Sequence, residues 1–276
     1  MTSFAEREQR SGTANGVPYL ILPPASGRAD APIVVGWHLF DPPRTESAFA
    51  AAMPLDGLDA WRIYLGLPLC GARKPAGGDE EVMRLGMEDA VRNLYGPVQD
   101  QAVAEFEPTL AAIKAEHGLT GDRLGLFGGS AGAAAALGVL AATSLPVAAA
   151  VVVSPLTELR PLVAANGRLY GIVYPWDAGS EAIADKIDFV ARAPELARAG
   201  APLRLLIGEL DDAEAIHAPA IAVAEALVAA GVEAEATVVP NMPHMLVDPP
   251  GDEPAPQTDY AAAADRLAVE WFDRRL

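Results

Sequence analysis

Residues 124–132 constrain the fold of this chain more than any other stretch does. An apolar run over residues 124–127 predicts a buried strand. The run leads directly into a G-x-S-x-G pattern over residues 128–132, and an alanine-rich segment without charge or proline follows over residues 133–142. The sequence therefore predicts a strand, a tight turn and a helix in immediate succession, with a serine on the turn.

This serine, Ser130, has the surroundings that a nucleophile requires. A sharp turn brings the residues two before and two after the serine into near contact, and Gly128 and Gly132 leave the space that a Cβ would fill. The backbone N–H of Ala131 then lies at a helix N-terminus, where it can stabilise an oxyanion. Because glycine–serine pairs are also common in ordinary loops, the prediction requires a histidine and an acid further along the chain.

The chain has four histidines, and His244 is the one placed as a general base should be. It lies in a loop directly after a predicted strand, downstream of the serine. In contrast, His38 precedes the serine, His117 ends a predicted helix, and His217 lies within another. We therefore expect His244 to contact Ser130.

The acid is expected between the serine and the histidine, after the preceding strand. Three carboxylates, Glu209, Asp211 and Asp212, follow a strand predicted over residues 203–207. Asp211 is the preferred partner because it lies three residues after the glycine at the strand's carboxyl end. Glu209 is the stronger alternative, followed by Asp212, and each acid could also serve only as a solvated turn residue or helix cap.

The order serine, aspartate, histidine along the chain is that of the α/β-hydrolases. The chain resembles this superfamily over nearly its whole length, through residues 128–132, residues 208–211 and the loop that holds His244. Residues 61–68, with Gly71 and Arg73, resemble its fourth strand and the following loop. Residues 122–135 also resemble the catalytic domain of prolyl-oligopeptidase-like enzymes.

The second oxyanion donor departs from the superfamily's pattern. Members usually carry glycines after the third strand, whereas residues 36–43 have none beyond His38. By position, the N–H of Leu39 is expected to assist that of Ala131, with Phe40 as the alternative. The loop somewhat resembles that of dienelactone-hydrolase-like members, which use a cysteine where this chain has Ser130.

Alternating apolar runs and helical stretches predict an α/β fold, a doubly wound, mostly parallel sheet with helices on both faces. Functional residues should lie at the carboxyl ends of its strands. Strands are expected at residues 17–22, 32–37, 62–66, 123–127, 148–153, 203–207 and 233–239, and helices at residues 99–117, 131–142, 215–230 and 259–274.

We expect one domain over residues 1–276, with a small lid or cap inserted at about residues 154–201. Phe40, Tyr174 and Trp176 are predicted to line a substrate pocket, although ordinary packing between lid and sheet would use the same residues. Three methionines, Met83, Met87 and Met242, could contact substrate, but core filling is their commoner role.

The composition of the chain excludes several classes of binding partner and cofactor. The chain has 20 basic and 37 acidic residues, a net charge of −17, which argues against nucleic acid or an anionic membrane as partner. Cys70 is the only cysteine, and no metal-ligand spacing, phosphate-binding loop or dinucleotide fingerprint occurs, so neither metal nor cofactor is expected. The expected partner is a small-molecule ester, and a homo-oligomer is compatible with the fold.

The sequence predicts neither a secretory signal nor a membrane-spanning segment. Residues 1–9 are charged and lack the apolar run of a secretory signal. The uncharged stretch over residues 131–153 is interrupted at residues 143–146, as in a buried helix followed by a buried strand. A cytoplasmic location is therefore expected.

These features predict a serine hydrolase, most simply a carboxylesterase acting on a small to medium ester through an acyl-enzyme. The alternatives are a peptidase or thioesterase of the same fold, and a non-catalytic binding protein that retains it. Reaction of Ser130 with a fluorophosphonate would separate an enzyme from a binding protein.

Overall fold

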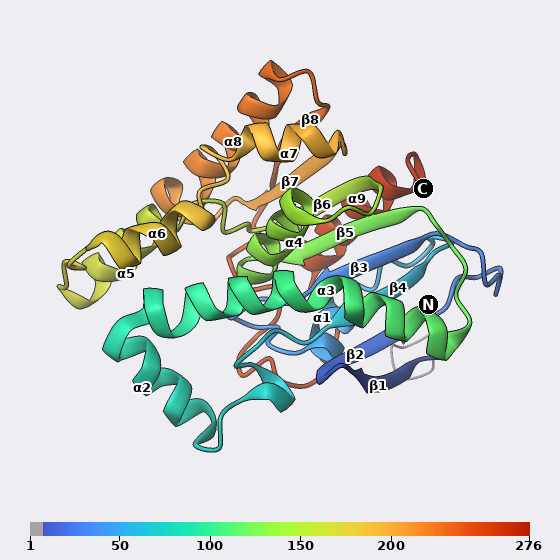
Figure 1. Ribbon diagram of the computed structural model, residues 1–276, viewed down its shortest axis with the longest axis horizontal. Helices are drawn as coiled ribbons and strands as arrows, with labels where there is room; N and C mark the ends of the chain where they lie inside the picture. Colours follow the sequence, from blue (N-terminus) through green and yellow to red (C-terminus); the bar gives the residue numbers. More distant parts are fainter. Residues whose placement is uncertain (1–7) are drawn as a thin grey trace.

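A computed structural model describes residues 8–276 of the chain (Figure 1). The prediction that the chain has no secretory signal rests largely on residues 1–7, which lie outside the described residues. Within the described part, no helix is both long enough and apolar enough to cross a membrane.

The described residues form an eight-stranded sheet in the order β1-β2-β4-β3-β5-β6-β7-β8. Neighbours from β4 to β8 run parallel, and the β1–β2 and β2–β4 pairs are antiparallel. The strands are β1 (Arg10–Ala14), β2 (Val17–Leu22), β3 (Ile33–Trp37), β4 (Trp61–Leu65), β5 (Leu124–Gly129), β6 (Val147–Val153), β7 (Leu203–Gly208) and β8 (Ala234–Val239).

Helices cover both faces of this sheet. Residues of α3, α4, α7 and α8 belong to the apolar cluster on one face, and residues of α1 and α9 belong to the cluster on the other. The predicted fold class is thereby confirmed. The helices are α1 (Glu46–Ala52), α2 (Gly78–Ala90), α3 (Gly96–His117), α4 (Ala131–Ala142), α5 (Leu159–Tyr170), α6 (Ala178–Lys186), α7 (Ala193–Ala199), α8 (Ala218–Ala229) and α9 (Asp259–Asp273). Short π-helical turns over Val91–Tyr95 and Ala213–His217 lead into α3 and α8.

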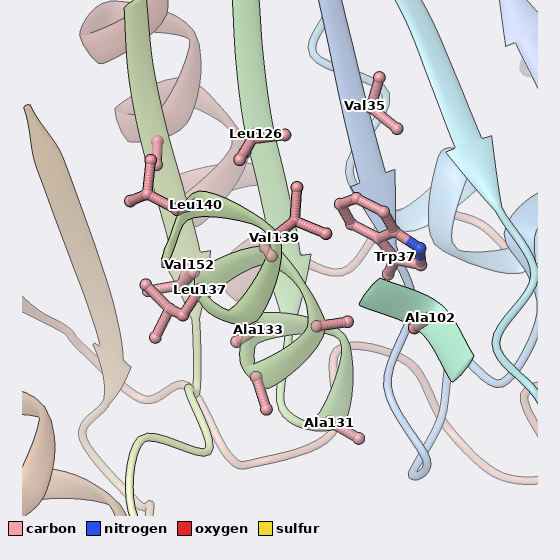
Figure 2. Close-up of a cluster of buried hydrophobic side chains, with 14 of the residues drawn as sticks. Val35, Trp37, Ala102, Leu126, Ala131, Ala133, Leu137, Val139, Leu140 and Val152 are labelled. Atoms are coloured by element: carbon pink, nitrogen blue, oxygen red, sulfur yellow. The ribbon is translucent and has the colours of Figure 1, made fainter. Parts of the chain in front are cut away.

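The alanine-rich helix α4 packs closely on the centre of the sheet. Its residues from Ala131 to Leu140 are all buried. Figure 2 shows α4 side chains against Trp37 of β3, Leu126 of β5 and Val152 of β6. Small side chains allow the helix backbone to approach the strands, and this contact fixes the helix N-terminus beside Ser130.

Two parts of the fold differ from the sequence-based expectation. Strand β1 was not predicted, although Asn15 and Gly16 join it to β2 in a two-residue turn with φ of 49° and 79°. An Asn-Gly pair favours a type I′ hairpin, so this signal was present in the sequence. The second difference is α2, which extends from the sheet in Figure 1 and contains no buried residue.

The segment between β6 and β7 contains three helices, α5, α6 and α7. It coincides with residues 154–201, where an insertion was expected. Both α5 and α2 lie beyond the same edge of the sheet (Figure 1). The structure thus places helices from two connecting segments, β4 to β5 and β6 to β7, near the carboxyl ends of the strands.

Candidate active site

Ser130 lies on the turn between β5 and α4, with φ of 48° and ψ of −114°. This is a strained conformation for a residue with a side chain, and it is typical of a nucleophile elbow. A Cβ on Gly128 would lie 2.2 Å from the carbonyl oxygen of Gly132, and a Cβ on Gly132 would lie 2.2 Å from that of Trp37. Glycine is therefore required at both positions for the turn to form.

The structure brings Ser130, His244 and Asp211 into one chain of hydrogen bonds. Nε2 of His244 lies 2.9 Å from Oγ of Ser130, and Nδ1 lies 2.6 Å from Oδ1 of Asp211. Since a carboxylate only accepts, Nδ1 carries the hydrogen, and Nε2 is left to accept from the serine hydroxyl. This is the tautomer that a general base requires.

Asp211 itself is held rigidly. Its side chain is fully buried, and its second oxygen, Oδ2, accepts the backbone N–H of Gly208 at 2.8 Å. The N–H of Leu210 donates to the carbonyl of Met242 at 3.0 Å, which joins the turn after β7 to the loop that carries His244. These backbone bonds fix the distance between the acid and the imidazole.

The two alternative acids have other partners. Glu209 accepts the backbone N–H of Asn241 at 2.7 Å. Asp212 accepts the N–H groups of Glu214 and Ala215 and so caps the following helical turn. Of the three carboxylates after β7, Asp211 is the one bonded to His244.

Two carboxylates act on the charge state of His244. Burial of the imidazole favours its neutral form, but the hydrogen bond and charge of Asp211 outweigh burial and raise the pKa of His244 above its ordinary value. Asp41 adds to this effect, because its Oδ2 lies 3.8 Å from Nε2 of His244. An imidazolium formed during a reaction would therefore be stabilised from both ring nitrogens.

His38, which sequence analysis set aside as a base, fixes the loop after β3. The buried ring donates from Nδ1 to the carbonyl of Leu39 at 2.6 Å and accepts the N–H of Leu67 at Nε2, at 3.0 Å. Burial lowers the pKa of His38 to about 4, so the ring is neutral. Because a trans peptide directs C=O and N–H oppositely, this bond also sets the direction of the Phe40 N–H.

A cavity of about 610 Å³ is lined on one side by this loop and on the others by α2, α5 and the segment after α5. Two of the three residues expected at a substrate pocket, Phe40 and Tyr174, line this cavity. Trp176 contacts Tyr174 edge to face, with ring centroids 4.7 Å apart and ring planes at 64°, but it is not among the lining residues.

The helix α2 supplies a cavity wall that sequence analysis did not identify. Met83 and Met87 line the cavity and are 69% and 68% exposed, so the expectation that they fill the core is wrong. Met242 is fully buried, as core filling requires. Because α2 has no buried residue, its sequence carries no apolar stripe that would predict a helix around these two methionines.

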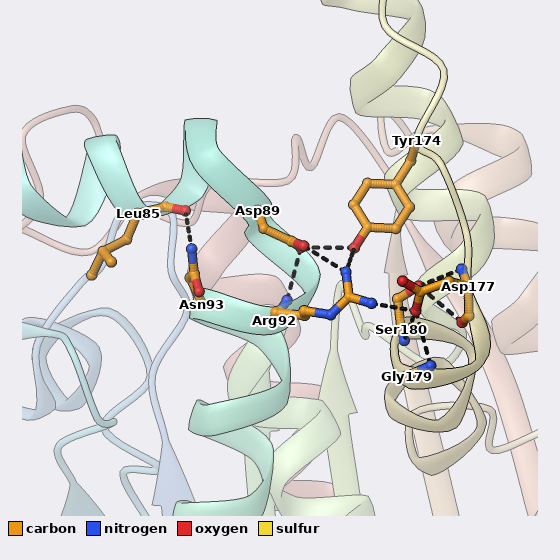
Figure 3. A network of polar contacts seen from close by, with 8 residues as sticks. All are labelled: Leu85, Asp89, Arg92, Asn93, Tyr174, Asp177, Gly179 and Ser180. Atoms are coloured by element: carbon orange, nitrogen blue, oxygen red, sulfur yellow. Dashed lines mark hydrogen bonds and ion pairs between the residues drawn. The ribbon is translucent and has the colours of Figure 1, made fainter.

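Polar contacts connect this wall with the insertion after β6. Figure 3 shows Arg92 among Asp89, Tyr174 and Asp177. The hydroxyl of Tyr174 donates to Oδ1 of Asp89 at 2.7 Å. The network therefore holds Tyr174 where the end of α2 meets the segment between β6 and β7.

The family model of the prolyl oligopeptidase family, peptidase family S9, matches residues 89–273. This match includes Ser130, Asp211 and His244 and spans more than half of the chain. The chain belongs to the prolyl oligopeptidase family. The superfamily resemblance seen in the sequence is thereby confirmed, and family membership supports a serine hydrolase.

Solved structures share the fold of this family member at low sequence identity. An acylaminoacyl peptidase from Pyrococcus horikoshii has a TM-score of 0.66 and 14% identity, over 100% of this chain and 42% of that protein. A puromycin-hydrolyzing peptidase from Mycobacterium tuberculosis has a TM-score of 0.62 and 18% identity, over 96% and 39%. The chain therefore spans about two fifths of these peptidases.

An esterase of similar extent has the same fold. A cold-adapted esterase from an Arctic intertidal metagenomic library has a TM-score of 0.57 and 20% identity, and the match covers 100% of both chains. No curated protein is detectably similar in sequence to this family member. Within residues 8–276, no group of three or more His, Cys, Asp or Glu side chains is placed to hold a metal ion.

Proposed function

We propose that this member of the prolyl oligopeptidase family is a serine hydrolase that cleaves small to medium carboxylic esters through an acyl-enzyme. The observation that carries the proposal is the continuous hydrogen-bonded chain from Ser130 through His244 to Asp211. Its serine lies on a strained turn at a helix N-terminus, and its acid is fully buried.

In the proposed reaction, Oγ of Ser130 attacks the ester carbonyl while Nε2 of His244 removes the hydroxyl proton. His244 then returns this proton to the leaving alkoxide, and the acyl group remains on Ser130. A water molecule, deprotonated by the same nitrogen, attacks the acyl-enzyme and releases the carboxylic acid. Asp211 stabilises the imidazolium in both steps without taking its proton.

The oxyanion of each tetrahedral intermediate would be bound by two backbone N–H groups. One is that of Ala131, the first residue of α4. For the second we favour Phe40 over the expected Leu39, because the bond from His38 fixes the carbonyl of the Leu39–Phe40 peptide. Each such donor lowers the barrier by about 3 kcal/mol in enzymes where one has been removed.

Two observations support an ester substrate. The Arctic metagenomic esterase matches the chain over the full length of both proteins. In addition, the cavity of about 610 Å³ has a size typical of small-molecule sites. Its walls include the apolar side chains of Val82, Met83, Leu94 and Val163, which suit an apolar acyl or alcohol group.

A peptidase is the second candidate. It is favoured by the family match and by the structural likeness to the acylaminoacyl and puromycin-hydrolyzing peptidases. Both activities would use the same three residues, so the substrate rather than the triad distinguishes them.

Paired substrates test the proposal. The protein is assayed with the p-nitrophenyl ester and the p-nitroanilide of the same N-protected alanine, which differ only in the bond that is cleaved. In a separate experiment, it is treated with a fluorophosphonate probe. We expect labelling of Ser130 and a higher kcat/KM for the ester than intrinsic reactivity alone explains. A greater rate enhancement for the anilide would favour the peptidase, and absence of labelling would contradict both candidates.

A further inference from the structure

Arg44 lies in the loop after β3 and lines the cavity beside the proposed active site. Its backbone N–H donates to the carbonyl of Gly251 at 2.8 Å, which anchors the loop at this residue. Its Nε is buried without a hydrogen-bond partner. The two terminal nitrogens are not buried, and within residues 8–276 they have no hydrogen bond or ion pair.

Partial burial without a partner distinguishes Arg44 from the other arginines that the structure describes. Those at least partly buried have carboxylate or carbonyl partners, as do Arg62, Arg73 and Arg204. The other described arginines without a partner, Arg198, Arg266 and Arg274, are exposed to solvent. A guanidinium that is partly removed from water without a counter-ion is unfavourable, so a ligand anion at Arg44 would be stabilising.

The other charged groups at the cavity are mostly neutralised within the protein. Lys74 bridges Asp79 and Asp252 at 2.8 and 3.0 Å. Asp89 is paired with Arg92, and Glu88 with Arg84. Among the described lining residues, Arg44 is therefore the cation available to a bound ligand.

Asp41 restricts where a ligand anion can lie. Its carboxylate is next to Nε2 of His244, at 3.8 Å, and would repel a substrate carboxylate placed beside the imidazole. Arg44 follows three residues later on the same loop and faces the same cavity. A ligand anion is thus favoured at Arg44 and disfavoured beside the imidazole.

We propose that Arg44 binds a carboxylate of the substrate, so that the preferred substrates carry a carboxylate several bonds from the cleaved carbonyl. The proposal rests on the proposed function, because it assigns the substrate class of the same site. Two terminal N–H groups of one guanidinium match the two oxygens of a carboxylate. Half-esters of dicarboxylic acids are the simplest compounds with this chemistry.

Binding without turnover tests Arg44 independently of the reaction. Monomethyl and dimethyl esters of the dicarboxylic acids from succinate to suberate are titrated calorimetrically into Ser130→Ala protein. At one or more chain lengths, we expect the monomethyl ester to bind about tenfold or more tightly than the dimethyl ester, since hydrogen bonds between charged groups have this strength. Equal binding at every length would overturn the proposal.

A second substitution assigns the preference to Arg44. In Ser130→Ala/Arg44→Gln, the difference between the two esters should disappear, and Arg44→Lys should restore part of it. The matched control is Arg198→Gln, an exposed arginine on α7, which should keep the full difference. A preference that survives in Arg44→Gln protein of unchanged thermal stability would contradict the assignment.

Two further outcomes separate the possible errors. If monomethyl esters bind through Arg44 but wild-type protein hydrolyses none of them, Arg44 binds a carboxylate as proposed and the proposed ester hydrolysis is wrong. If methyl phosphate competes with the monomethyl ester at equal or lower concentration, the site is a phosphate site and the carboxylate assignment is wrong.

Discussion

The carboxylate of Asp41 lies 3.8 Å from Nε2 of His244, while Asp211 bonds the other ring nitrogen at 2.6 Å. Both negative charges favour the imidazolium, and together they raise the pKa of His244 despite its burial. The proposed base must be neutral to act, so this arrangement sets the pH below which activity is lost.

Asp41→Asn should move the acidic limb of the profile of kcat/KM against pH to lower pH. The substitution removes a charge that favours the imidazolium, so the pKa of His244 falls and more neutral base is present in acid. Measurement of kcat/KM for ester hydrolysis from pH 4 to pH 9 gives the midpoint of this limb. Asp79→Asn, at the same cavity but paired with Lys74, is the control and should leave the limb in place. A shift of the Asp41→Asn limb to higher pH would contradict this account.

Asp211→Asn should lower kcat by a factor on the order of 10⁴, because an amide at this position favours the wrong imidazole tautomer. Glu209→Gln and Asp212→Asn are matched substitutions in the same turn and should retain most of the activity. Steady-state kinetics on one ester compares the three variants. If Glu209→Gln were the most damaging, the assignment of the acid would be wrong.

The buried His38 should make the protein less stable in mild acid. Burial lowers its pKa from 6.5 to about 4, so between these values the unfolded chain binds a proton that the folded chain does not. The free energy of unfolding should therefore fall as the pH decreases from about 6.5 towards 4, by on the order of 3 kcal/mol.

Urea denaturation of wild type and His38→Gln at pH 7, 6 and 5 measures this effect. The variant is expected to be less stable at pH 7 but to lose less stability on acidification, because its side chain does not titrate. Parallel losses in the two proteins would show that another group is responsible.

Gly132→Ala should destabilise the protein and abolish activity, because the new Cβ would lie 2.2 Å from the carbonyl of Trp37 and 2.3 Å from that of His38. Gly118→Ala is a useful comparison, since that position has φ of 66° and nothing within 4 Å. It should cost only about 1–2 kcal/mol of backbone strain. Thermal unfolding of the two variants should rank Gly132→Ala as the less stable, and the opposite order would contradict the close packing at the turn.

Most of the sheet could be predicted because parallel strands are buried on both faces and form continuous apolar runs. The expected strands agree with β2 to β8 to within two residues at each end. The proximity of Ser130, Asp211 and His244 could be predicted for a related reason. Each residue follows a strand, and parallel strands end at the same edge of the sheet.

The cavity could not be predicted in the same way. Helix α2 has no buried residue, and its two methionines line the cavity. Its sequence therefore lacks the stripe of apolar, core-facing residues from which a helix is predicted. Ion pairs between residues far apart in the sequence, such as Lys74 with Asp252, could not be predicted either. The unpaired state of Arg44 is visible only once all other pairs are known. Likewise, the choice between the N–H groups of Leu39 and Phe40 depends on a hydrogen bond from His38.

The most direct test of ester hydrolysis by Ser130 is the turnover of p-nitrophenyl esters from acetate to dodecanoate, with wild type and Ser130→Ala measured side by side. We expect wild type to hydrolyse the shorter and medium esters, with an optimum set by the cavity, and Ser130→Ala to fall to the background rate. Activity that persists in Ser130→Ala, or a wild type inert to the whole series, would contradict the account.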